Sequence, residues 1–525
     1  MAQAVISNSE KTEVSIFKKY GLPVALIVFF IIIFLPQPAG LSVAGQRMLA
    51  LLVFSVIIWM TEAVSYPVSS AVILTIITLS LASAPIVVDP HKLELVNPHN
   101  LYGMTRALEL GLGGLTTSAW AMVAAALFLS AAMQKTGFDK RLALNILSMV
   151  GTRTRNVLAG VIMVGFVLAF FVPSTTARVA CIVPIIMAII TAFGVDRRGK
   201  FASVLMIACA QADSIWNVGI KTAAAQNMIA INFIKSMLGK DISWFDWFIA
   251  AAPFAIIMSV LLYYTLLWLM RPELDDIPGG KAIVRKQLEE LGPMKAAEKK
   301  LMFISIILLI FWILEGRTFG NFGISGALAN TKIHPFDTAS ITILAVTIMF
   351  LPGVGIMTWG EAQSKINWGT IILFGVGISL GTAIVKTGAG VWLAHYLVQT
   401  LGLATSTPFV ILAIMALFLI IIHMGFASAS ALAAALIPII ISVLQQVVAS
   451  KGAGSINILG MTMILQYVVS FGFILPVNAP QNMIAYGTDT FTVRDFVRTG
   501  IPLTLFAYAV TLLLAATYWK FLGYV

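Results

Sequence analysis

Polar residues interrupt several otherwise apolar stretches of this sequence, and most of them have hydroxyl or carboxamide side chains. Such groups hydrogen-bond the oxygens of an anion without adding a fixed charge. Glycine and proline in the same stretches break helical hydrogen bonds, which frees carbonyl groups for a cation and N–H groups for an anion. The residues predicted to bind a small anion are Ser174, Thr175, Thr176, Lys221, Gln226, Asn227, Ser428, Ser430, Asn478, Gln481 and Asn482. Those predicted to bind a cation, with Na⁺ as the candidate, or to take its place are Ser174, Arg178, Asn217, Gly219, Ser428 and Asn478.

Arg178, Lys221 and Asp213 are charged residues inside apolar stretches, where a charge is costly enough to indicate function. The two basic residues can attract an anion or stand where another protein would hold a cation. The simpler alternatives are snorkelling to the membrane surface and pairing with Asp213. Asp213 itself can be a pairing partner, a cation ligand or a titrating carboxylate. His423 lies in an apolar stretch, where histidine usually only packs, although a role in proton coupling stays open.

The composition predicts a membrane protein. Hydrophobic residues make up 59% of the 525 residues and charged residues only 10%, with a mean hydropathy of +0.97. A soluble fold cannot bury so much apolar surface. The net charge of +11 comes from basic residues spread through short loops, so no nucleic-acid partner is expected. Cys181 and Cys209 both lie in apolar segments, and a disulfide framework is not expected.

Apolar runs of about 20 residues are long enough to cross the bilayer, and we expect an all-α membrane protein with eleven such spans. The first lacks a small-residue cleavage site and is predicted to be a retained helix. The expected spans are residues 21–38, 45–62, 66–86, 117–134, 201–235, 246–270, 300–316, 338–353, 368–385, 456–488 and 500–522.

Two further apolar stretches, 156–193 and 407–448, have a polar break at their centre and are predicted to be re-entrant hairpins. Irregular backbone is tolerated at membrane depth only where it is buried in protein or lines a watery cavity. With the N-terminus inside and the C-terminus outside, about two-thirds of the 33 basic residues fall on the inner face. We therefore expect a multi-pass protein of the cytoplasmic (inner) membrane, with an inner hairpin at 156–193 and an outer hairpin at 407–448.

Three motifs occur twice in the same order, about 250 residues apart. Ser174-Thr-Thr-Ala recurs as Ser428-Ala-Ser-Ala, Gln-Asn-Met-Ile-Ala starts at 226 and 481, and Lys-Thr-Gly starts at 135 and 386. Each copy holds five expected spans and one hairpin, and the odd number inverts the second copy, which is typical of secondary transporters. The predicted divisions are an N-terminal segment with the first helix (1–44), inverted repeat 1 (45–270), a cytoplasmic linker (271–299) with helical spacing in its middle, and inverted repeat 2 (300–525).

The segment Trp59-Met-Thr-Glu-Ala-Val resembles an early motif of the divalent anion:sodium symporters, a family that includes bacterial sodium-dependent dicarboxylate transporters. The stretch from Ile366 to Gly381 and the linker segments Pro278-Gly-Gly-Lys and Leu291-Gly-Pro-Met-Lys are similar as well. The resemblance extends from about residue 45 to the end. It implies eleven spans, two opposed hairpins, a homodimer, and an elevator-like movement of the substrate-binding part against a fixed scaffold.

The sequence departs from this family at its binding motifs. The Ser-Asn-Thr tips of the family stand here as Ser174-Thr-Thr and Ser428-Ala-Ser, and its Thr-Pro-Pro-Asn elements stand as Ala224-Ala-Gln-Asn and Ala479-Pro-Gln-Asn. In the family these positions contact the substrate carboxylate and surround sodium. Some relatives that exchange dicarboxylates without sodium also have arginine just after the first tip, as Arg178 is here, and histidine before the second. The resemblance leaves sodium symport and exchange both open.

These features together predict a secondary active transporter for small divalent organic anions such as succinate, malate or fumarate, driven by sodium or by anion exchange. No cofactor is expected apart from Na⁺ as a candidate coupling ion. The alternative is a transporter of another anion, such as citrate, tartrate, sulfate or a sulfonate. A membrane receptor or an intramembrane enzyme is the remote alternative, because no hydrolase, phosphate-loop or metalloprotease motif occurs in the sequence.

Overall fold

Helices form nearly all of the regular structure, as the apolar composition predicts. The computed structural model describes residues 16–89, 94–95, 100–151, 153–192, 194–273, 275, 280–322 and 330–525. The N-terminal residues 1–15 and linker positions 274 and 276–279 of the predicted divisions lie outside the described residues. The helices before the linker are α1 (Ile16–Phe34), α2 (Val43–Thr61), α3 (Tyr66–Ala82), α4 (Gly103–Leu112), α5 (Ser118–Thr136), α6 (Phe138–Met149), α7 (Thr154–Phe171), α8 (Thr175–Ala192), α9 (Lys200–Gly219), α10 (Ala225–Leu238) and α11 (Trp244–Met270).

The second part of the chain continues the helical pattern. Its helices are α12 (Gly280–Glu290), α13 (Ala296–Leu314), α14 (Thr338–Phe350), α15 (Trp359–Gln363), α16 (Trp368–Lys386), α17 (Ala389–Thr400), α18 (Pro408–His423), α19 (Ala429–Lys451), α20 (Ile458–Val469), α21 (Pro480–Tyr486), α22 (Val493–Ala516) and α23 (Tyr518–Phe521). Short 3₁₀ turns are η1 (Gly113–Thr116), η2 (Lys221–Ala223), η3 (Phe319–Phe322) and η4 (Pro476–Asn478).

A pair of short strands is the one departure from an all-α fold within the described chain. Strand β1 (Val87–Asp89) pairs antiparallel with β2 (Glu94–Leu95), with Val87 opposite Leu95. The prediction of an all-α protein missed this ladder, because two and three residues are too few to show an alternating pattern.

Seven helices of the described chain are long and apolar enough to cross a membrane, or eight if the bent pair of α4 and α5 counts as one span. Some expected spans are shorter or interrupted. The helices at 66–86 and 338–353 have 17 and 13 residues, whereas about 20 are needed for a straight crossing. The expected spans 201–235 and 456–488 are each broken by a 3₁₀ turn. Eleven spans therefore remain a prediction.

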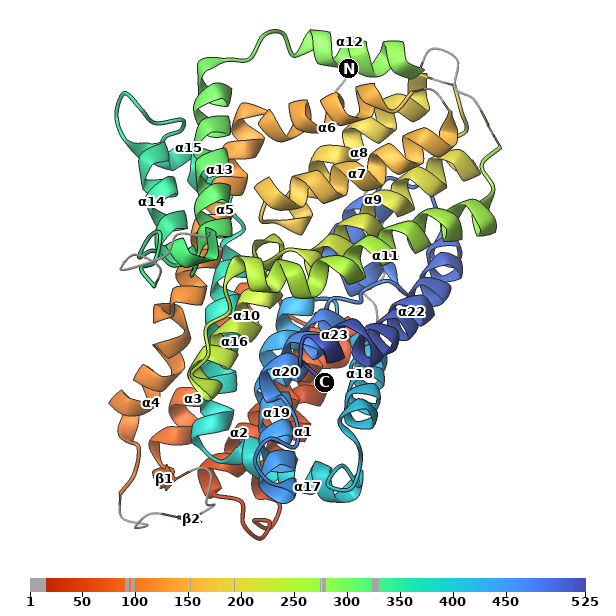
Figure 1. The fold of residues 1–525 in the computed structure, drawn as a ribbon. Helices are drawn as coiled ribbons and strands as arrows, with labels where there is room; N and C mark the ends of the chain where they lie inside the picture. The colour runs from red at the N-terminus through yellow and green to blue at the C-terminus, as the bar shows by residue number, and fades with distance from the viewer. Residues whose placement is uncertain are drawn as a thin grey trace, which may run out of the picture.

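The two predicted hairpins are pairs of antiparallel helices that approach from opposite sides. Helices α7 and α8 lie in the upper half of the molecule and α18 and α19 in the lower half (Figure 1). The turn at Ser174 joins the first pair and the turn at Ser428 the second. Each serine precedes the first residue of its long helix, so its side chain can cap the helix.

The duplicated Lys-Thr-Gly motifs have the same conformation in the two copies. Gly137 (φ 74°) ends α5 and Gly388 (φ 73°) follows α16, and each precedes a helix of 12 residues, α6 or α17. Glycine takes this left-handed conformation without steric cost, so the motif ends one helix and redirects the chain into the next.

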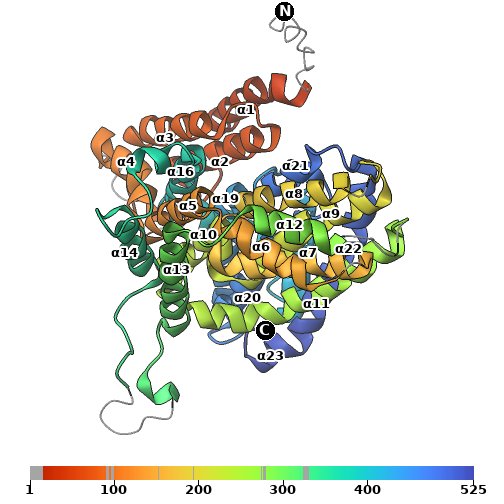
Figure 2. The same cartoon turned by 90° about the horizontal axis from the view of Figure 1, so that it is seen from above.

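The helices can be divided into two sets that meet where α19 packs on α16 and α10 packs on α5 (Figure 2). We call α1–α5 with α13–α16 the α16 group, and α7–α11 with α18–α22 the hairpin group. The linker helix α12 packs on α6 and α8, and the Arg141 guanidinium holds the linker end through Glu298 (2.9 Å) and the carbonyl of Gly292 (3.0 Å). The linker thus joins the halves on the side of the first hairpin.

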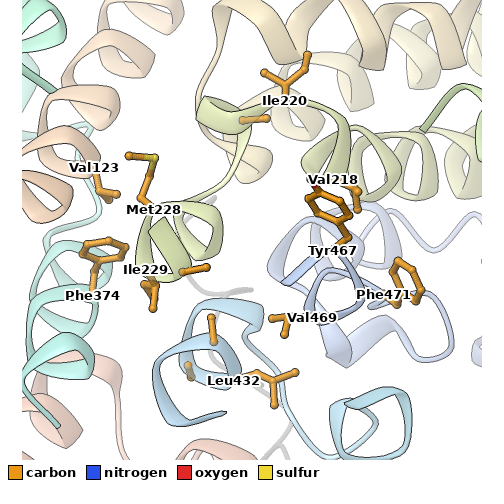
Figure 3. Packing of buried hydrophobic residues seen from close by; sticks show 14 of the residues in the cluster. Val123, Val218, Ile220, Met228, Ile229, Phe374, Leu432, Tyr467, Val469 and Phe471 are labelled. Carbon is orange, nitrogen blue, oxygen red and sulfur yellow. The ribbon is translucent and has the colours of Figure 1, made fainter. Parts of the chain in front are cut away.

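Apolar side chains from both halves fill the space around the helix breaks (Figure 3). Val218 and Ile220 lie at the start of the first break, and Val469 and Phe471 lie at the start of the second. Leu432 occupies the place in the second hairpin that Arg178 has in the first, and it is fully buried. The two copies therefore share a backbone pattern but surround it with different chemistry.

We predict that the bases of the two hairpins open to opposite sides of the membrane. Arg198→Cys, beside the first hairpin, should react with a membrane-impermeant maleimide only from the cytoplasmic side, and Thr405→Cys, before the second, only from outside. Both side chains are exposed, whereas native Cys209 is buried and Cys181 partly so. Inside-out vesicles expose the cytoplasmic side to the reagent, and intact cells expose the outer side. Labelling of both positions from one side would contradict the opposed hairpins.

Candidate functional site

A cavity of about 370 Å³ lies where the two hairpin turns meet the two helix breaks. The first turn provides Ser174, Thr175 and Thr176, and the second provides Ser428 and Ser430. Gln226 and Gln481 enter from the residues that follow the breaks. The structure therefore brings together, in one cavity, polar residues that the duplicated motifs singled out. Binding of a ligand by each of these residues stays a prediction.

Five helices of the described chain with more than ten residues begin at the cavity wall. The first turns of α3, α8, α10, α16 and α19 all contribute lining residues. The N–H groups of a first helical turn have no partner within their own helix, and the helix dipole adds a partial positive charge there. The wall can thus attract an anion without a fixed charge.

The two hairpin serines are arranged as hydrogen-bond donors. The Ser174 hydroxyl oxygen accepts from the N–H of Ala177 (3.4 Å), and that of Ser428 accepts from Ala431 (3.3 Å). The Ser174 hydroxyl donates to no described residue, so its hydrogen is free for a ligand, whereas the Ser428 hydroxyl also hydrogen-bonds the side chain of Tyr66. Thr176 and Ser430 beside them make no side-chain hydrogen bond within the described part of the chain. Hydroxyl hydrogens from both halves are therefore available to anion oxygens.

Arg178 lies directly behind the first hairpin turn and does not line the cavity. Its Nε donates to a carboxylate oxygen of Asp213, and its Nη2 donates to Oδ1 of Asn217 at 2.6 Å. Its Nη1 donates to the carbonyls of Val172 (2.7 Å) and Ala223 (3.1 Å), which come from the hairpin turn and the helix break. Of these partners, only Asn217 was among the residues predicted for a cation, and the cation site stays a prediction.

Of the three roles left open for Asp213, the geometry supplies the pairing partner. Arg178 and Asp213 both have an exposed side-chain fraction of 0%. Breaking a buried pair leaves an uncompensated charge, so the two residues depend on each other.

Asn478 has a matching place in the second half. Its Nδ2 lies near the carbonyls of His423 (3.0 Å), Met424 (3.1 Å) and Phe426 (3.2 Å), all in the second hairpin. It is 2% exposed and does not line the cavity. A neutral amide thus holds the carbonyls of the second turn, where a charged guanidinium holds those of the first.

Asn217 lines the cavity, whereas the predicted asparagines Asn227 and Asn482 contact the interrupted backbone. Asn227 donates to the carbonyls of Asn217 (2.8 Å) and Ile220 (3.2 Å), and Asn482 donates to that of Gly472 (2.8 Å). Neither lines the cavity. These contacts give partners to carbonyls that the helix breaks set free.

Gly219 ends α9 in a tightly packed position. A Cβ there would lie 2.8 Å from the Trp216 ring and 3.0 Å from Ala255, so the absence of a side chain permits the packing. Gly219 does not line the cavity. Its predicted part in a cation site stays a prediction.

Lys221 does not line the cavity either. Its ammonium lies 2.8 Å from the carbonyl of Ile242, 2.9 Å from Oε2 of Glu315 and 2.9 Å from Oγ1 of Thr338. Three partners match the three hydrogens of an ammonium group. The predicted binding of substrate by Lys221 stays a prediction, and in this structure the side chain joins the first break to α13 and α14 of the α16 group.

His423 lines the cavity at the base of the second turn and is 2% exposed. Its Nε2 is 3.4 Å from the carbonyl of Asn478, which requires the proton on that nitrogen. Its Nδ1 is buried without a partner among the described residues. Its role in proton coupling remains open.

The sequence analysis missed the part of the wall that the α16 group provides. Tyr66 of α3, Gln134 of α5, and Asn367 and Thr370 at the start of α16 all line the cavity, and so does the exposed Lys365. None belongs to the duplicated motifs. Two family-like stretches were the available signals: Asn367 and Thr370 lie between Ile366 and Gly381, and Tyr66 lies in the segment Trp59-Met-Thr-Glu-Ala-Val-Ser-Tyr-Pro-Val.

Comparison with known proteins identifies the family. Residues 18–525 match the model of the sodium:sulfate symporter transmembrane region. A "membrane protein" of Cupriavidus necator is 48% identical over 506 residues, covering 96% of this chain and 93% of that protein. The sodium-dependent dicarboxylate transporter SdcS of Staphylococcus saprophyticus is 24% identical, covering 97% and 92%. The inner membrane protein YbhI of Escherichia coli is 25% identical, covering 96% and 98%.

A solved structure shares the fold. The YdaH transporter of Alcanivorax borkumensis superposes with a TM-score of 0.55 at 14% sequence identity, covering 86% of this chain and 97% of that one. The family match includes almost all of the described chain and confirms the resemblance seen in the sequence. The chain therefore belongs to the sodium:sulfate symporter family and is a multi-pass secondary transporter, not an enzyme.

Proposed function

We propose that the protein moves small divalent organic anions, the dicarboxylates succinate, malate and fumarate among them, across the cytoplasmic membrane. The supporting observation is the cavity at which the helices α3, α8, α10, α16 and α19 begin, and where the hydroxyls of Ser174, Thr176 and Ser430 donate to no described residue. No aspartate or glutamate is among its described lining residues. Helix N-termini bind carboxylate groups well, and donors from two opposed sides suit a ligand with an acidic group at each end.

The movement is of the elevator type in this proposal. The cavity lies between the hairpin group and the α16 group, with lining residues from each. Sliding of one group against the other would expose the cavity to the two sides in turn. The proposed frame has eleven spans, two inverted repeats with re-entrant hairpins, a cytoplasmic N-terminus, an outer C-terminus and a homodimeric assembly.

We propose anion exchange as the coupling mode. The supporting observation is the Arg178 guanidinium, which donates to the carbonyls of Val172 and Ala223 beneath the first turn. A fixed positive charge repels a second cation strongly in a low-dielectric interior. Sodium symport is the competing mode, and its support is the family description together with the name of SdcS. The alternative substrate is another anion, such as citrate, tartrate, sulfate or a sulfonate.

Uptake into liposomes tests function and coupling together. We expect labelled malate uptake to require an internal dicarboxylate, and to change less than about 2-fold when sodium replaces potassium, because the Arg178 guanidinium beneath the first turn repels a second cation. Succinate, citrate and sulfate are measured in parallel. Uptake that follows a sodium gradient without an internal anion would establish symport instead. Absence of flux for all four anions, with and without internal anion, would refute the proposed function.

Substitution of Arg178 alone should lower the stability of the protein more than substitution of Arg178 and Asp213 together. Arg178→Leu, which copies Leu432 of the second half, leaves the Asp213 carboxylate buried and unpaired. We expect the free energy of unfolding to fall by about 3–5 kcal/mol, and by clearly less in Arg178→Leu with Asp213→Asn. Unfolding of the purified protein in micelles measures both. Equal stability of Arg178→Leu and wild type would show that the pair is not a structural requirement.

Lys221 should affect transport through Glu315 rather than through the ligand. Lys221→Met leaves the Glu315 carboxylate without its cation where the first break meets α13, and we expect the maximal exchange rate to fall about 10-fold. The KM for malate should stay the same, and Glu315→Gln in the same protein should restore much of the rate. A raised KM that the double variant does not correct would instead identify Lys221 as a substrate ligand.

A further inference from the structure

Gln481 has a side chain whose direction is fixed by its neighbour. It is the second residue of α21, 4% exposed, and it lines the cavity. Its Nε2 lies 3.0 Å from the hydroxyl oxygen of Ser214 in α9 of the other half. The hydroxyl of Ser214 donates its one hydrogen to the carbonyl of Ala210 at 3.0 Å. Ser214 can therefore only accept from Gln481, which requires the amide nitrogen of Gln481 on that side.

The carbonyl oxygen of Gln481 is left facing the ligand space. Oε1 accepts no hydrogen bond from any residue in the described chain, yet it is not one of the buried atoms without a partner. The corresponding oxygens of Gln211 and Gln466 are buried and unpartnered. Because Gln481 lines the cavity, its Oε1 remains accessible from there.

Gln226 is the matching residue of the first half, but its direction is not fixed. Its Nε2 is 3.2 Å from the hydroxyl of Ser470. That hydroxyl donates to no other described residue, so it can donate to Gln226 as well as accept from it. Gln226 can then offer the ligand either end of its carboxamide. Of these two matching glutamines, only Gln481 has a carboxamide group whose orientation is fixed.

An acceptor of this kind restricts the ligand. The hydroxyl groups of the cavity can donate or accept, but a carbonyl oxygen can only accept. A carboxylate oxygen placed against Gln481 Oε1 would meet a like partial charge, and an apolar group would leave the oxygen unsatisfied as water is expelled. A ligand with its own donor at that point avoids both costs.

We infer that the cavity selects a small anion with two acidic groups that also carries a hydrogen-bond donor, a hydroxyl or an ammonium group, and that Gln481 is the residue that determines this specificity. This inference rests on the proposed function. It does not depend on the coupling mode, because Oε1 of Gln481 faces the ligand and not Arg178 or the residues that Arg178 contacts.

Competition against labelled malate tests the inference with the full-length protein in liposomes. The competitors differ only in the substituent on one carbon: malate has a hydroxyl, aspartate an ammonium, succinate a hydrogen and methylsuccinate a methyl group. We expect malate or aspartate to compete about 10-fold better than both succinate and methylsuccinate, the effect of one hydrogen bond. Malate and aspartate separate the two donor classes, and methylsuccinate controls for size.

Three variants locate the effect. In Gln481→Met, which keeps the length without the oxygen, the preference over succinate should shrink to about 2-fold. Ser214→Ala removes the anchor and should reduce the preference as well. Gln226→Met, the matched variant, should retain the preference, whatever it does to the total flux. Equal competition by all four anions in the wild type would overturn the inference, as would a preference unchanged in Gln481→Met and Ser214→Ala. Absence of uptake for malate, succinate, citrate and sulfate alike in the wild type would refute the proposed function itself, and the inference with it.

Discussion

Interrupted helices inside apolar surroundings leave carbonyl and N–H groups that hydrocarbon cannot satisfy, and the architecture of this protein depends on how those groups find partners. Asn227 and Asn482 bridge carbonyls within the two breaks, while Arg178 and Asn478 reach carbonyls of the hairpin turns. These contacts hold the turns and breaks against one another. The N–H groups of the following helices are then free to face one cavity.

The charges near the site are arranged in pairs, which leaves the cavity itself without a fixed buried charge. Arg178 is matched by Asp213, and Lys221 by Glu315. Lys365 lines the cavity but is exposed, so solvent screens it. Contact with an anion therefore rests on helix dipoles and hydroxyls, whose effect is stronger where water is excluded. The direction of each neutral dipole, such as that of Gln481, then decides what the ligand must carry.

Much of the site could be read from the duplicated motifs, since they marked both hairpin turns and the residues after both breaks. The wall from α3 and α16 could not, because Tyr66 and Thr370 lie outside the duplicated motifs. Asn227 and Lys221 lie close to Gln226 along the chain and were predicted with it. Lys221 lies in the break itself, and Asn227 lies one residue further round α10 than Gln226, so Gln226 lines the cavity while Asn227 and Lys221 contact other parts of the protein.

Sequence alone determined the membrane class, the family and the four polar segments, because hydropathy and repeated motifs can be recognised along the chain without knowing its fold. It also showed that Arg178 and Lys221 have no counterpart in the second half. Only the tertiary structure decided which polar side chains face the cavity. Whether a side chain contacts a ligand, a carboxylate or a free carbonyl depends on residues more than 90 positions away, as Glu315 is from Lys221 and Ser214 from Gln481. Such pairings are set by packing, which local sequence does not encode.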